Sequence, residues 1–328
     1  MLSRVADSLY WMSRYLERAE HTARQIDVNL HQMLEQTGMN TTVRWELLLE
    51  SLHIASSDEA NDAYSTTQLL TFDQTNTFSI VSCISAAREN ARQIREQISS
   101  EMWEQLNQLF LHVKSSTMEE MWFGEPHQFL SSVKAGVHLF QGITDATMSH
   151  SEGWHFIRLG RFLERAMATA SQLDVYFTEL LSTQPPSEYD IGQPNYLNWV
   201  GLLRSCAAFE AYNKVYTAVM QPDHIAEFLL LNADSPRAIR FCAAMMQVAL
   251  QNIAHATNTR SPSKAERVVG RLRAALDYDQ IDEVMSSDMH AYLETIRRQC
   301  VQIQDAIYQT YLSYPIDVAI TLRGAAQA

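Results

Sequence analysis

The sequence predicts an all-α protein, an internally duplicated helical bundle in which two similar helical halves pack into one body. Its 328 residues include only 10 Gly and 8 Pro, so few residues suit turns, while residues that favour helices dominate. Apolar residues recur at intervals of three and four, the spacing of one helix face. One long pattern of polar and apolar residues occurs twice, which indicates duplication.

The first copy of this pattern runs from Ser3 to Leu30 and predicts a helix of about seven or eight turns. Its apolar residues form one seam, which consists of Val5, Leu9, Met12, Leu16, Ala19, Ala23, Ile26 and Leu30. A second stripe at the same spacing is polar and consists of Tyr10, Arg14, Glu17, His21 and Arg24. We therefore expect one buried face with a row of functional groups beside it.

In the second copy, Glu164-Arg165-Ala166 aligns with Glu17-Arg18-Ala19, and Arg161 aligns with Arg14. Its apolar seam returns in phase as Phe156, Leu159, Leu163, Ala166, Ala170, Leu173 and Phe177. We therefore expect a first helical repeat at 1–150, a second at 151–315, and a tail at 316–328 that lacks periodicity. The apolar seams indicate that the halves pack together and are not separable domains.

Shorter periodic segments predict the remaining helices. In the first repeat we expect helices near residues 41–52, 77–98, 103–113 and 130–140, with Thr75 or Thr77 as a cap and a polar segment at 56–67. In the second repeat, Ser182 to Pro194 is expected to form a surface loop, and Ser235-Pro236 is expected to start a helix through Ile239 and Cys242.

Composition and charge exclude several classes of function. A net charge of -13 opposes binding to nucleic acid, and no basic tract overrides it. The N-terminus carries an early acid and no long apolar run, so we expect no membrane span and a cytoplasmic protein. The four cysteines are far apart and are expected to be buried and reduced. No Gly-rich phosphate loop is present, so we expect no ATP site and no cofactor.

The residues from Tyr10 to Ala19 and from Gly153 to Ala166 resemble the bacterial alpha-E family, and Ala87 to Arg92 resembles a further motif of that family. The likeness extends from Met1 to about Leu312. It implies an all-helical protein whose relatives are commonly encoded beside, or fused to, a circularly permuted ATP-grasp amide ligase. Many also lie beside a transglutaminase-like cysteine peptidase. The resemblance thus implies a role in making or attaching small peptides.

The two polar stripes are the candidate site if they meet in one cleft between the halves. Arginines there would hold glutamates ionised, and spare guanidinium donors would grip a carboxylate or phosphate. The candidate catalytic residues are Glu17, Glu164 and His21. The candidate substrate-binding residues are Tyr10, Arg14, Arg18, Arg88, Asn90, Arg92, Arg161 and Arg165. The alternative is a set of helix-surface ion pairs worth about 0.2–0.5 kcal/mol each.

Three functions follow from these residues. The first is an accessory protein that holds a peptide or amino-acid substrate for an ATP-grasp ligase. The second is a stand-alone enzyme of amide or peptide chemistry, with Glu17 or Glu164 as general base and His21 as proton carrier. The third is a helical scaffold without a ligand.

Glu50 with His53 and Glu152 with His155 have the Glu-x-x-His spacing of di-iron bundles, but chance explains both pairs, so no metal is expected.

Overall fold

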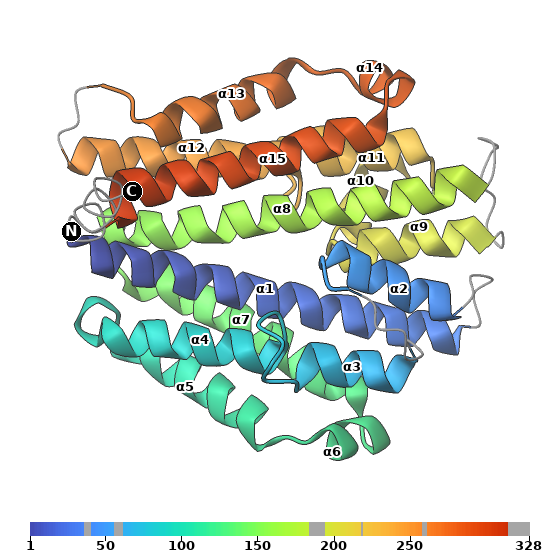
Figure 1. The fold of residues 1–328 in the computed structure, drawn as a ribbon, viewed down its shortest axis with the longest axis horizontal. Helices are drawn as coiled ribbons and strands as arrows, with labels where there is room; N and C mark the ends of the chain where they lie inside the picture. The colour runs from blue at the N-terminus through green and yellow to red at the C-terminus, as the bar shows by residue number, and fades with distance from the viewer. Residues whose placement is uncertain (36–40, 56–61, 184–193, 218, 258–260, 314–328) are drawn as a thin grey trace, which may run out of the picture.

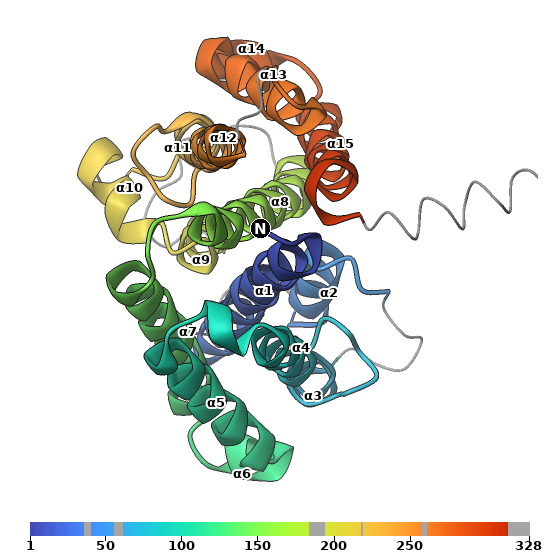
Figure 2. The same ribbon diagram turned by 90° about the vertical axis from the view of Figure 1, so that its left-hand side faces the viewer.

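The computed structural model describes residues 1–35, 41–55, 62–183, 194–217, 219–257 and 261–313. Every regular element within these ranges is helical, which confirms the predicted all-α class. Two helices of 32 residues each, α1 (Ser3–Leu34) and α8 (Glu152–Thr183), lie side by side at the centre (Figures 1 and 2). They run parallel, because the Met1 ammonium lies 2.9 Å from the Glu152 carboxylate at their shared starting end.

Helices of the N-terminal half pack around α1. The two that contact α1 most extensively are α4 (Ile80–Gln93) and α7 (Pro126–Thr147), and α5 (Ser100–Ser115) packs against both. The other helices of this half are short: α2 (Thr41–Ser51), α3 (Ala63–Thr71), the 3-10 turn η1 (Arg95–Gln97) and α6 (Met118–Phe123). Serine side chains cap α4 and α5, since Ser79 and Ser99 accept from the backbone N–H three residues on.

A similar succession of helices surrounds α8 (Figure 2). Here α12 (Ile239–Ala256) and α15 (Met289–Ile307) pack on α8, and α13 (Lys264–Tyr278) packs against both. The remaining elements are α9 (Pro194–Ser205), α10 (Phe209–Tyr216), α11 (Pro222–Leu231), α14 (Ile281–Ser286) and the π turn η2 (Tyr308–Leu312). Helix α2 packs on α8 and α9 packs on α1, so each half reaches onto the long helix of the other.

The apolar seams form the centre of the core. All predicted seam residues of α8 are buried, and those of α1 are buried except Leu30, which is partly covered. The two long helices approach most tightly at Gly160, where a Cβ atom would lie 2.4 Å from the Tyr10 carbonyl oxygen. Only glycine fits at this contact without displacing the backbone. The seams and this contact together fix how the polar stripes face each other.

Several expected boundaries differ from the structure. Part of the expected polar segment is helix α3, which Asp62 caps by accepting from the Ser65 N–H. Ser79, and not Thr75 or Thr77, caps α4, and α4 ends at Gln93. Helix α12 begins at Ile239, three residues after Pro236. Most of the expected loop from Ser182 to Pro194, and the whole expected tail at 316–328, lie outside the described residues.

Among the described residues, no helix combines the length and the apolar character that crossing a membrane requires.

Candidate functional site

The polar stripes of α1 and α8 meet through reciprocal ion pairs. The Glu17 carboxylate of α1 accepts from Arg165 of α8, with Nε 2.5 Å from Oε1 and Nη2 3.0 Å from Oε2. The Glu164 carboxylate of α8 accepts from Nε of Arg14 and Nε of Arg18, each at 2.6 Å. Each glutamate is therefore held by arginine on the opposite long helix, as the cleft hypothesis requires.

These pairs are buried and keep both glutamates ionised. Burial alone would raise the pKa of the Glu164 carboxyl, but the charges and hydrogen bonds of Arg14 and Arg18 outweigh it and lower that pKa to about 2. The pKa of Glu17 is lowered in the same way, since Arg165 and Arg237 outweigh its burial. Carboxylates held so far below neutral pH are weak bases, which disfavours their use as general bases.

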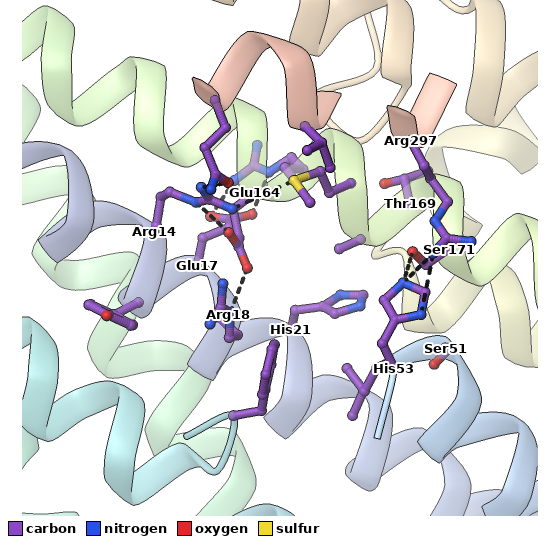
Figure 3. A pocket seen from close by; sticks show the side chains of 18 of the residues that line it. Arg14, Glu17, Arg18, His21, Ser51, His53, Glu164, Thr169, Ser171 and Arg297 are labelled. Carbon is purple, nitrogen blue, oxygen red and sulfur yellow. Dashed lines mark hydrogen bonds and ion pairs between the residues drawn. The ribbon is translucent and has the colours of Figure 1, made fainter. Parts of the chain in front are cut away.

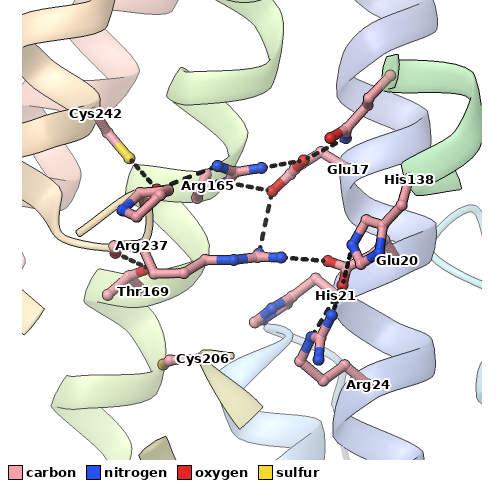
Figure 4. A network of polar contacts seen from close by, with 12 residues as sticks. Glu17, Glu20, His21, Arg24, His138, Arg165, Thr169, Cys206, Arg237 and Cys242 are labelled. Carbon is pink, nitrogen blue, oxygen red and sulfur yellow. Dashed lines mark hydrogen bonds and ion pairs between the residues drawn. The ribbon is translucent and has the colours of Figure 1, made fainter. Parts of the chain in front are cut away.

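A second buried glutamate extends the network on the α1 side (Figure 4). Arg237, from the segment before α12, bridges the two carboxylates, with Nη1 3.2 Å from Glu17 and Nη2 3.0 Å from Glu20. Arg24 also pairs with Glu20, and His138 Nε2 lies 3.4 Å from it. Arg237 is held in place because Thr169 donates to its carbonyl at 3.1 Å. The segment before α12 is thus anchored to both long helices.

A cavity of about 890 Å³ opens beside these pairs, with walls from α1, α2, α8 and α15 (Figure 3). Its lining includes six arginines, which are Arg14, Arg18, Arg165, Arg237, Arg297 and Arg298. The glutamates of the lining are Glu17, Glu164 and Glu294. The lining thus holds three more arginines than glutamates in a chain whose net charge is -13, although Glu20 and Asp174 lie behind it and pair with Arg237 and Arg297. A positive cavity in a negative protein concentrates anions.

Arg18 keeps much of its hydrogen-bonding capacity for a ligand. Its Nε binds Glu164, while its terminal nitrogens make no hydrogen bond within the described part of the chain. The guanidinium carbon lies 4.5 Å from the centre of the Phe78 ring, and the side chain is 15% exposed. Arg14 differs, because its nitrogens contact Glu164, Tyr10, Gln304 and the Met167 sulfur. Arg18 is therefore oriented and still able to bind an anion.

His21 lies on the cavity wall but is poorly suited to carry protons at neutral pH. Burial, with a further contribution from the Arg237 charge, lowers the pKa of its imidazole to about 4. Its Nε2 lies 2.6 Å from the Gln25 amide nitrogen, so the ring is a neutral acceptor there. The Tyr10 hydroxyl accepts from Arg14 at 3.1 Å and lies outside the cavity lining.

Arg161 is buried near the network without joining it. Its side chain makes no hydrogen bond or ion pair within the described residues, and its Nε is enclosed. Burial lowers the pKa of this guanidinium, which the nearby Glu17 charge only partly offsets. Glu17 is already engaged by Arg165, by Arg237 and by the Gln141 amide. The site is consequently asymmetric, as the replacement of Glu20 and His21 by Met167 and Ala168 in the second motif also indicates.

The structure does not bring the α4 candidates to the cavity. The small residues of α4, Ala87 and Ala91, face the core, which turns the polar neighbours outward. Arg88 donates to Asn107 at 2.8 Å, Asn90 donates to a backbone carbonyl of its own helix, and exposed Arg92 pairs with Glu89. These three candidates therefore form a separate group on α4 and α5.

Several cavity residues were missed in the sequence. Arg237 precedes its helix, where no periodic pattern points to it, and Arg297, Arg298 and Gln304 lie on α15, which was expected only as an apolar helix. The spacing of polar residues from the apolar residues of α7 and α15 did indicate two of the network residues. Gln141 and Gln304 occupy equivalent positions relative to Leu130 and Leu293, and each contacts the network, at Glu17 and Arg14 respectively.

Asp27, His31 and His127 are the only described residues grouped closely enough to resemble a metal site. The Lys134 ammonium already lies 2.5 Å from Asp27 Oδ2. A similar arrangement joins Asp174 to His290 at 2.7 Å and to Arg297 at 3.5 Å. Because a fixed cation accompanies each aspartate, we interpret both groups as ion-pair clamps between a long helix and its neighbour.

Comparisons with known proteins place the geometry in context. A family model described as a predicted alpha-helical domain with a conserved ER motif matches residues 1–312. An uncharacterized protein of Mycobacterium bovis is 23% identical over 340 residues, and two of Mycobacterium tuberculosis are 23% and 22% identical. Each match covers 95% of this chain but 37% of the relative, so the chain spans little more than a third of these relatives. No solved structure matches significantly.

Proposed function

The chain belongs to the Alpha-E family, and on that basis we propose that it is an accessory protein that holds a small anionic substrate for a partner enzyme. The proposed partner is a circularly permuted ATP-grasp amide ligase, with a transglutaminase-like peptidase as a second candidate. The proposed process is small-peptide synthesis or peptide tagging in the cytoplasm. The substrate is an amino acid or peptide that binds between the halves.

The positive cavity carries this proposal. Arg18 offers free terminal nitrogens, and its guanidinium is held between Glu164 and the Phe78 ring. A guanidinium fixed in this way is suited to bind a carboxylate or phosphate with two parallel hydrogen bonds. The stripes are buried around a cavity and are not exposed, which disfavours a plain helical scaffold.

Catalysis by a partner is supported by what the cavity residues are suited to do. Glu17 and Glu164 are weak bases, and His21 is neutral at pH 7. The sequence contains no Gly-rich phosphate loop, so ATP chemistry is assigned to the partner. In the mycobacterial relatives, 63% of the length lies outside the match, which supports joint action with another protein unit.

We also infer that the two halves arose by duplication of one helical unit. The equal lengths of α1 and α8 and the similar succession of helices around them support this. So does the reciprocity of the Glu17–Arg165 and Glu164–Arg18 pairs, which join equivalent positions of the two motifs. Duplication would place two copies of the motif around a single cavity.

Co-purification with the ligase, followed by ligase turnover with and without this chain, tests the proposal. We expect added chain to lower the KM for the amino-acid or peptide substrate and leave the KM for ATP unchanged. Arg18→Gln should abolish that effect, whereas Arg92→Gln, which removes an exposed arginine outside the cavity, should not. A ligase that neither binds the chain nor responds to it would contradict the proposal.

A further inference from the structure

The cavity has cationic groups at two opposite ends. Arg18 lies at the inner end, beside the ion pairs of the long helices, and Arg297 and Arg298 lie at the outer end on α15. In Figure 3, Arg18 and Arg297 lie on opposite sides of the open space, with His21 between them. A ligand with a single anionic group would use only one of these ends.

The outer end also has a cation without an acidic partner. Arg297 is engaged, because it pairs with Glu294 at 3.0 Å and contacts His53 Nε2 at 3.0 Å. Arg298 makes one hydrogen bond, to the Thr295 hydroxyl at 3.0 Å, and no ion pair within the described residues. Arg298 therefore resembles Arg18 in having donors free for a ligand.

The geometry of α15 sets the scale of the separation between the two ends. Gln304 marks the inner end, since its amide oxygen lies 2.5 Å from Arg14, which shares Glu164 with Arg18. Arg298 lies six residues before Gln304 on this helix, and a rise of 1.5 Å per residue sets their Cα atoms about 9 Å apart along the helix axis. An extended peptide advances about 3.3–3.6 Å per residue, so about three residues span the interval.

The wall between the ends is mostly uncharged. Leu52, Met167, Ala168 and Val301 belong to the lining, and His21 is held neutral by its burial. The lining cations Arg165 and Arg237 are engaged by Glu17 and Glu20. These groups offer no ion pair to the middle of a ligand and suit a connecting segment without charge. The cavity is thus positive at both ends and mainly apolar between them.

We infer that the cavity binds a linear dianion, such as an acidic peptide of two or three residues with a carboxylate at each end. The inference rests on the proposed function, in which this cavity holds the substrate. One carboxylate binds the terminal nitrogens of Arg18, and the other binds Arg298 at the rim. The spacing of the two cations selects ligands by length.

Calorimetric titration of the full chain, without a ligase, tests this inference. The probes are N-succinyl-oligoglycines, which carry a carboxylate at each end, and N-acetyl-oligoglycines of equal length, which carry one. Affinity for the succinyl series should peak at intermediate length and exceed that of the acetyl series by about tenfold, the effect of one charged hydrogen-bonded group. Equal affinity of the two series, or no optimum of length, would overturn the inference.

Two substitutions test which arginine binds each carboxylate of the ligand. Arg18→Gln and Arg298→Gln should each remove the advantage of the succinyl peptides, and the matched variant Arg92→Gln should retain it. Arg298 is exposed, so its substitution tests the inference even if Arg18→Gln impairs folding. If the succinyl peptides show an optimum of length but the chain has no effect on a ligase, the proposed function is wrong and the dianion inference stands. If the chain affects a ligase but binding shows no optimum of length, the dianion inference is wrong and the proposed function stands.

Discussion

Arg14 on α1 and Arg161 on α8 occupy equivalent positions in the two motifs, yet their surroundings differ. Arg14 is 2% exposed and bonds to Glu164, Tyr10 and Gln304. Arg161 is 9% exposed and makes no hydrogen bond within the described residues. A repeated motif therefore does not guarantee repeated interactions.

The difference originates outside the motif. Each oxygen of Glu17 accepts two hydrogen bonds, Oε1 from Arg165 and Arg237 and Oε2 from Arg165 and Gln141, so no acceptor position remains for Arg161. On the other side, Met167 stands where Glu20 stands on α1, and no second buried glutamate competes for the cations. Arg237, which lies outside both motifs, thus accounts for the different ion pairs of the two motifs.

The largest expected effect is that of Arg14→Met. The substitution leaves buried Glu164 with Arg18 as its remaining cation, and breaking a buried pair by removing one partner costs about 3–5 kcal/mol. Unfolding in urea, followed by circular dichroism, measures the loss of stability. A loss no larger than that of an exposed ion pair would show that the buried network contributes little.

The next effect is on stability in acid. The pKa of Glu164 is about 2 in the folded chain against 4.5 as its ordinary value, so its stabilisation is fully present above pH 4.5 and is lost as the pH falls toward 2. That shift corresponds to about 3 kcal/mol. Unfolding free energies measured between pH 5 and pH 2 should therefore fall less steeply for Glu164→Gln than for the unsubstituted chain. Parallel curves would refute the assignment.

A smaller effect is expected for Arg161→Met, and it sharpens the comparison with Arg14. Replacing an unpaired buried cation by an apolar side chain of similar length removes a desolvation cost, so stability should change by less than about 1 kcal/mol or increase. Urea unfolding of Arg161→Met and Arg14→Met under the same conditions compares their losses of stability. Similar losses from both substitutions would mean that Arg161 has a partner after all.

The smallest effect is expected for Arg92→Gln. Arg92 and Glu89 form an exposed pair one turn apart on α4, where solvent and salt screen the interaction. The unfolding midpoint and the binding of the oligoglycine probes should match those of the unsubstituted chain. A clear loss of probe binding would place α4 at the ligand, contrary to its position in the fold.

The seams and the Glu-Arg stripes were predictable because they depend on helix periodicity, which one sequence displays in full. Arg18, Arg165, Glu17 and Glu164 were found in this way. The prediction that Arg88 binds substrate in the cavity was wrong, because resemblance to a motif does not specify which face of α4 meets α1. Arg237 and Arg298 were not found, since their roles depend on how distant segments pack.

Gly160 controls more than the local fit of two backbones. The helix continues from Tyr10 to Leu34 for about 36 Å, at 1.5 Å per residue. The contact at Gly160 therefore acts as a pivot near one end of two long rods, and a small tilt there becomes a displacement of several ångströms at the other end. Any side chain larger than hydrogen at position 160 would therefore change the separation of α1 and α8 along the polar stripes that line the cavity.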